Sequence, residues 1–167
     1  MAFTISGTAG ATFPDSTTQT TAFSTPVSVA DGGTGVTSST GTTSVVLSNA
    51  PTITNPTITN YVESVVAIGT VTSSSTISLT SGTVQTATLT ASTACTFTMP
   101  TATAGKSFVL LLKQAASTGN GTATFTGVKW ATAGAPTITA TAGKMDILTF
   151  VSDGTNWYGS YSQGYTP

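Results

Sequence analysis

The stretch that most constrains the fold is residues 145–161, MDILTFVSDGTNWYGSY. Residues 145–151 alternate as in a β-strand, and both faces of that strand would be mostly apolar. A strand of this kind is typical of one buried between two layers. Residues 152–156, SDGTN, then provide turn chemistry, and an aromatic segment returns after them. The stretch predicts the last hairpin of an all-β domain.

The same β pattern extends over residues 61–167. Short strand-like runs, such as residues 83–91 and 106–115, alternate with clusters of Ser, Gly and Thr. They recur roughly every 8–12 residues, a spacing typical of sandwiches and jelly rolls. We therefore predict an all-β head over residues 61–167, built as a β-sandwich of jelly-roll-like topology. Cys95 alternates with apolar residues there and is expected to be a buried thiol.

Residues 1–60 have a different character and end in a perfect repeat, PTITN-PTITN, over residues 51–60. Proline excludes helix and central strands, so the segment is expected to be an extended arm. One extended segment cannot bury its own isoleucines, whereas three chains wound around a common axis can. We therefore predict an intertwined homotrimer in which residues 1–60 serve attachment and trimerisation, although the composition also fits a disordered linker. The candidates for the trimer core are Ile53, Ile58, Val45 and Leu47.

Charge is scarce in this chain. Only 5% of its residues are charged, with a net charge of −1 and no histidine, against about 25% charged residues in an average globular protein. Without a basic cluster, a nucleic-acid partner is excluded. The lack of charge also means that identical chains do not repel one another.

The chemistry-bearing residues do not form a recognisable catalytic or metal-binding pattern. The single cysteine and the absence of histidine exclude Cys-His and Ser-His-Asp arrangements and soft metal sites. A carboxylate pair such as Asp146 and Asp153 is the remaining option for glycosidase chemistry, but a strand and a turn explain both residues. We expect a chain that is not an enzyme and binds no cofactor or metal.

The N-terminal sequence, MAFTISGTAG, has neither the basic nor the apolar region of a signal peptide. No run approaches the roughly 18 apolar residues of a membrane span, so no membrane insertion is expected. Threonine-rich, uncharged β chains usually work outside cells. A virion protein, assembled in the host cytoplasm and released by lysis, reconciles these two observations.

Three residues are candidates for ligand contact. Trp130 and Tyr165 have aromatic faces that can stack on sugars, and Asn120 lies in a turn that contains two glycines. For Trp130 the alternative is that the ring caps the core or a contact between subunits.

Three stretches resemble bacteriophage fibre proteins. Residues 11–22, ATFPDSTTQTTA, resemble their FPDGTTQTTA segment, with Ser16 in place of the usual turn glycine. Residues 30–51, ADGGTGVTSSTGTTSVVLSNAP, resemble the GGTG-containing stretch of phage tail fibres. Residues 150–158, FVSDGTNWY, resemble the closing hairpin of their C-terminal domains.

The resemblance implies a homotrimeric virion appendage, docked on another virion protein through its N-terminal arm. Our leading expectation is a short tail fibre that contacts the host cell surface, with a neutral surface glycan as a possible ligand. The alternatives are a capsid head fibre or decoration protein and, in a different class, a non-catalytic carbohydrate-binding module.

Overall fold

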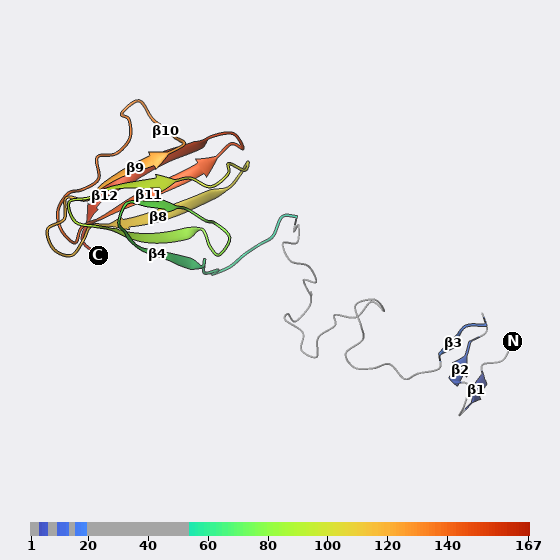
Figure 1. Ribbon diagram of the computed structural model, residues 1–167. Helices are drawn as coiled ribbons and strands as arrows, with labels where there is room; N and C mark the ends of the chain where they lie inside the picture. Colours follow the sequence, from blue (N-terminus) through green and yellow to red (C-terminus); the bar gives the residue numbers. More distant parts are fainter. Residues whose placement is uncertain (1–3, 7–9, 14–15, 20–53) are drawn as a thin grey trace. The chain divides into compact units, whose positions relative to one another are not determined.

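The computed structural model describes residues 4–6, 10–13, 16–19 and 54–167 (Figure 1). The chain divides into two units, Met1–Ile58 and Thr59–Pro167. All regular secondary structure in the described residues is β-strand, which confirms the all-β class. The division falls close to the predicted boundary between residues 60 and 61.

The described part of the first unit contains a small antiparallel sheet. Its strands are β1 (Thr4–Ser6), β2 (Gly10–Thr12) and β3 (Thr18–Gln19), in that order. The turn between β2 and β3 is closed by Phe13, whose N–H donates to Thr17 O (2.9 Å). Ser16 in this turn has a φ of 70°, a conformation that glycine adopts without steric cost.

The end of the pentapeptide repeat is irregular in backbone conformation. Asn55 and Asn60, which close the two copies of the repeat, have φ values of 50° and 55°. Asparagine is one of the few residues that adopts this left-handed conformation readily. The two asparagines therefore bend the backbone in the same sense, and residues 54–64 contain no strand.

The head is built from two sheets. The larger one has the strand order β10-β12-β11-β8-β6-β4, and the smaller one the order β5-β7-β9. The strands of the larger sheet are β4 (Val65–Val71), β6 (Val84–Leu89), β8 (Ser107–Lys113), β10 (Val128–Trp130), β11 (Met145–Ser152) and β12 (Trp157–Tyr165). Those of the smaller sheet are β5 (Ser74–Thr76), β7 (Ala94–Thr98) and β9 (Thr122–Thr126).

From β4 to β9 the chain alternates between the two sheets, so that it winds as a solenoid. Strands β4, β6 and β8 are parallel neighbours in the larger sheet, and β5, β7 and β9 are parallel neighbours in the smaller one. Jelly rolls consist of antiparallel Greek keys, so the predicted jelly-roll topology is wrong. The physical reason is that neighbouring strands in each sheet are one full coil of the solenoid apart, so they run in the same direction.

The last two strands close the solenoid as an antiparallel hairpin, as the sequence predicts. β11 pairs antiparallel with β8 on one side and with β12 on the other. The turn between them begins at Asp153, whose carboxylate accepts the N–H groups of Thr155 (2.8 Å) and Asn156 (2.7 Å). A bulge in β12 follows at Gly164, where the buried Asp146 carboxylate accepts the Gly164 N–H (3.0 Å).

Aromatic side chains fill the space between the sheets. Phe97 of β7 stacks on Phe125 of β9 at 5.4 Å, and Phe108 of β8 stacks on Phe150 of β11 at 4.7 Å. Phe125 also meets Phe150 at 5.7 Å, which joins the two layers. Cys95 is buried as predicted, and its Sγ donates to Val71 O (3.1 Å).

Candidate functional site

The three ligand-contact candidates lie in three separate places. Trp130 of β10 pairs with Gly159, on the side of the sheet that faces the core. Tyr165 pairs with Met145, whose neighbour Asp146 points into the core, so Tyr165 lies on the opposite side. Asn120 lies in the loop between β8 and β9. The structure therefore does not combine them into one site.

Trp130 is held by the core. Its ring makes edge contacts with Phe125 (5.8 Å), Phe150 (5.9 Å) and Tyr161 (6.0 Å). The ring also covers Gly159, where a Cβ would come within 2.5 Å of it. Most of the indole surface is thus used for packing, as in the alternative role for this residue.

Asn120 shapes its own loop. Its backbone has a φ of 57°, its N–H donates to Ala140 O (2.7 Å) and its side-chain Nδ2 donates to Thr118 O (3.1 Å). Tyr165, in contrast, keeps 43% of its surface exposed. Of the three candidates, Tyr165 is the one with a substantial free aromatic surface.

The trimer-core candidates fall in the less described part of the chain. Val45, Leu47 and Ile53 lie outside the described residues. Ile58 is 63% exposed in the single chain, and Val62, just before β4, is 92% exposed. Their burial by a second chain stays a prediction.

The carboxylates considered for glycosidase chemistry are far apart. Asp146 lies near the start of β11 and Asp153 just after its end, so a strand rise of about 3.3 Å per residue separates them by roughly 20 Å. Retaining and inverting glycosidases need about 5–10 Å. The Asp146 carboxylate is also engaged by hydrogen bonds within the head, since it accepts from Thr139 N (2.8 Å) and Gln163 Nε2 (3.1 Å) as well as from Gly164 N.

Sequence reasoning missed the surface that stands out in the head, which is the side of the larger sheet that faces away from the smaller one. We call it the outer face. Val65, Val84 and Val109 lie side by side there, in register with Thr149. The next outward row is Ala67, Thr86, Leu111 and Ile147. The available signal is the second apolar face of residues 145–151, for which the sequence predicts a covering layer.

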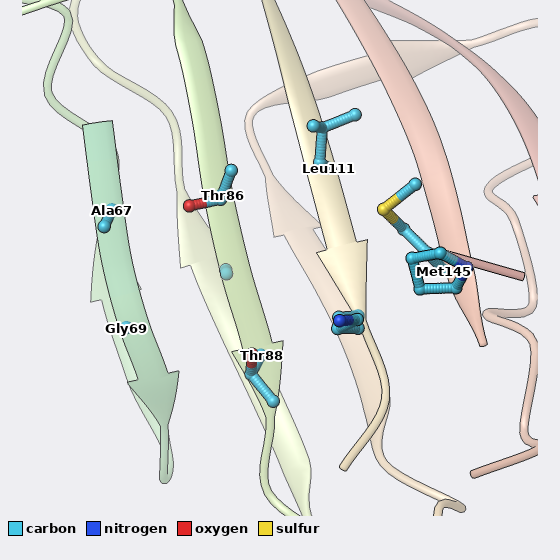
Figure 2. Close-up of a pocket in the computed structure, with 9 residues that line it drawn as sticks. Ala67, Gly69, Thr86, Thr88, Leu111 and Met145 are labelled. Atoms are coloured by element: carbon cyan, nitrogen blue, oxygen red, sulfur yellow. The ribbon is translucent and has the colours of Figure 1, made fainter. Parts of the chain in front are cut away.

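The outer face is hollowed on one side. A cavity of about 390 Å³ lies over the small residues Ala67, Gly69, Thr86 and Thr88. It is bordered by Leu111, Met145 and Lys113 of the sheet and by Pro167, which follows β12. Figure 2 shows the labelled side chains in order across four neighbouring strands, from Ala67 and Gly69 on β4 through Thr86 and Thr88 on β6 to Leu111 on β8 and Met145 on β11. The face thus combines a ridge of large apolar side chains with a hollow.

Charged groups lie around the outer face and not at its centre. Glu63 lies with Thr83, Val109 and Thr149 near one end of the sheet, and Lys113 lies at the other. Glu63 accepts hydrogen bonds from the hydroxyls of Tyr61 and Thr83.

At the closing turn, the pKa of Asp153 is lowered by hydrogen bonds. The largest effects come from the backbone N–H groups of Asn156 and Thr155, and the next from the Tyr158 hydroxyl. The same Asp153–Tyr158 hydrogen bond (2.9 Å) and the Asp153 charge raise the pKa of Tyr158 above its ordinary value of 10.0.

A second cavity, of about 540 Å³, is formed mainly by the loops after β5 and β7. Its polar lining is made of hydroxyls and one ammonium group, from Thr76, Ser78, Thr80, Thr101, Thr103 and Lys106. Such groups suit hydrogen bonding to a neutral polyhydroxylated ligand.

Within the described ranges, no three His, Cys, Asp or Glu side chains gather as a metal site. The described residues also contain no helix long and apolar enough to span a membrane.

No family model, curated protein or solved structure matches the chain. Function is therefore inferred from the sequence resemblance and from the geometry of the head.

Proposed function

We propose that the chain is a non-catalytic structural protein of a bacteriophage virion: a short homotrimeric tail fibre. Its N-terminal unit attaches to another virion protein, and its β head contacts the host cell surface. It assembles in the host cytoplasm, is released by lysis, and needs no cofactor, nucleic acid or membrane insertion.

The observation that carries this proposal is the division of the chain into an N-terminal unit and a β head with an uncovered apolar sheet face. A fibre subunit needs one part for attachment, one part for display and a surface on which copies pack. The resembling stretches support the same assignment, because residues 11–22 belong to the first unit and residues 150–158 form the closing hairpin of the second.

The head surface suits a neutral ligand. Charged residues are 5% of the chain, so contacts to a host glycan would come from hydroxyl, amide and aromatic groups, as in the hydroxyl-lined cavity near Thr101. Contacts of this kind depend little on ionic strength, because salt screens charges and not neutral hydrogen bonds. We therefore expect adsorption through this protein to persist at raised salt.

The proposal is tested on virions that carry a labelled copy of the chain and on virions that lack it. We expect the label at the tail in electron micrographs, and loss of adsorption without the protein. A label spread over the capsid together with normal adsorption would establish the decoration role instead. Particles without any label would refute a virion protein altogether.

Tyr165 offers a finer test of host contact. Tyr165→Ala removes an exposed aromatic ring at the end of β12 and is expected to reduce adsorption of assembled particles. Tyr61→Ala, which removes an exposed tyrosine ring before β4, is the control. Trp130 is unsuitable for this test, since its truncation would unpack the core.

A further inference from the structure

The outward apolar side chains of strand β11 have no second layer packed against them in the described head. Its inward side chains Leu148 and Phe150 are completely buried, as expected. Its outward side chains Met145 and Ile147 are only half-buried, and Val151 is 50% exposed. A strand that is apolar on both faces normally has a layer on each, and the described head supplies only one.

The uncovered apolar area is comparable with the largest apolar patches on monomeric proteins. The apolar rows cross four strands, from β11 to β4, and about six residue steps, which corresponds to roughly 15 Å by 20 Å, or about 300 Å² in projection. An apolar patch of this size is about the largest on a typical monomer and is often functional. A specific protein contact covers about 800 Å² per partner, of which this patch and its rim would supply a major part.

Large and small side chains divide the outer face. The larger side chains of Leu111 and Met145 border the hollow over Ala67, Thr86 and Thr88 (Figure 2). Ridge-in-hollow packing can be reciprocal in a pair or cyclic around a ring, and both arrangements close.

The distribution of charge favours a second copy of this chain as the partner of the outer face. The central rows of the outer face carry no charged side chain, while Glu63 and Lys113 lie at its two ends. Interfaces between proteins commonly have an uncharged centre and a polar rim. A partner with charges at its own centre would lose their hydration here without compensation, whereas a copy of this nearly uncharged surface would not.

We propose that the outer face is the contact between copies of this chain, with Leu111 and Met145 of one copy seated in the hollow over Ala67 and Thr86 of the next. This inference deepens the self-association in the proposed function and rests on that part alone. It does not depend on the place of the protein on a virion. Because Tyr165 pairs with Met145 on this same face, host contact through Tyr165 requires its ring to stay outside the contact between copies.

Paired cysteines in the full-length chain test the proposal. In the variant Thr86→Cys/Met145→Cys the two sites lie on β6 and β11, which flank β8. Two strand spacings, about 9.6 Å, separate these strands, beyond the limit of about 7 Å between Cα atoms for a disulfide. Any disulfide in this variant therefore joins two chains, and Cys95 stays silent because it is buried.

The control pair is Ser74→Cys/Thr126→Cys on the outward side of the smaller sheet. Its sites lie on β5 and β9, which flank β7, with the same offset of one outward position. After mild oxidation we expect most of the Thr86/Met145 variant, and little of the control, to run as linked chains on a non-reducing gel. The native mass of the unmodified chain is measured in parallel.

The outcomes separate this inference from the proposed function. An oligomer whose outer-face cysteines do not link, or link no better than the control pair, overturns the inference and leaves self-association standing. A monomer at all concentrations overturns both the inference and the homotrimer, and virion labelling then decides the remaining role independently.

Discussion

Phe150 shows at the scale of one residue how the closing hairpin holds the head together. Its ring is completely buried and contacts Phe108, Phe125 and Trp130, so it links both sheets. We expect Phe150→Ala to lower the free energy of unfolding by about 3–5 kcal/mol, through lost burial and the cavity left behind. Urea denaturation measures this change. Thr149→Ala, at the exposed neighbouring position, should cost less than about 0.5 kcal/mol, and equal effects of both changes would contradict this arrangement.

The closing turn gives a pH-dependent prediction. Because the pKa of Asp153 is lowered from 3.8, its stabilising effect is present above that value and is lost as pH falls through the lower folded-state pKa. Because the pKa of Tyr158 is raised from 10.0, its effect is present below that value and is lost as pH rises through the higher folded-state pKa.

Tyr158→Phe should therefore abolish the loss of stability at alkaline pH that Tyr158 causes. It should weaken the loss of stability at acid pH without abolishing it, because the backbone N–H groups of Asn156 and Thr155 still lower the pKa of Asp153. Melting temperatures from acid to alkaline pH measure both limbs. Asp153→Asn is the companion variant, and it should flatten the acid limb as well. If Tyr158→Phe left both limbs as steep as in the wild type, the hydrogen bond between the two side chains would have no role in stability.

At the scale of elements, a buried glutamine shapes the end of a solenoid coil. Gln114 Nε2 donates to Gly121 O (2.7 Å), and Gly121 N donates to Gln114 Oε1 (3.0 Å). There is no room for a larger residue at position 121, since a Cβ would lie 2.8 Å from Leu89 and Thr90. The side chain thus replaces a missing strand neighbour in the turn toward β9.

We predict that Gln114→Leu destabilises the head by about 1–3 kcal/mol for each buried backbone group that it leaves unpaired. Chemical denaturation provides the measurement. Ser117→Ala, at an exposed position in the same loop, should have little effect. Near-wild-type stability of Gln114→Leu would mean that water satisfies the turn as well as glutamine does.

The strands themselves were predictable, but their neighbours were not. The closing hairpin over β11 and β12 is confirmed. The expected layer on both faces of β11 is not found in the described head, because Thr149 and Val151 on its outward face are exposed. An alternating pattern fits antiparallel and parallel pairing equally. Residues 118–121, TGNG, are typical of a hairpin turn, yet Asn120 N bonds to Ala140 O and the chain crosses to the other sheet. Tertiary contacts of this loop, which no local pattern encodes, decide the topology.

The candidate site was less predictable than the fold. Aromatic residues were chosen for their exposed surface, but exposure depends on the partner strand: Trp130 lies over Gly159 and inside the core, while Tyr165 lies beyond the bulge on the other side. The outer face was visible in the sequence as a second apolar side of one strand. Only the sheet order shows that three further strands extend that side with Val65, Val84 and Val109.

At the scale of the whole molecule, the head contains its own core. All buried apolar residues found in the described chain lie between Val71 and Trp157, within the second unit. We therefore predict that the fragment 59–167 folds without the N-terminal unit. It should be β-rich by circular dichroism and melt cooperatively. Non-cooperative melting or complete loss of β structure would show that the N-terminal unit belongs to the same folding unit.

That fragment should also show what the outer face does without help from the N-terminal unit. If copies bind one another through this face, the native state is favoured by mass action, so the average mass and the melting temperature should both rise with protein concentration. Thr86→Glu places a charge in the hollow, where association would strip its hydration without a partner. We expect this variant to fold, because position 86 points outward, and to sediment as a monomer at concentrations where the unmodified fragment associates. Thr124→Glu, exposed on the smaller sheet, should behave like the unmodified fragment. Equal masses for all three proteins at every concentration would show that contacts between heads contribute nothing, and that any assembly of the full chain depends on its N-terminal unit.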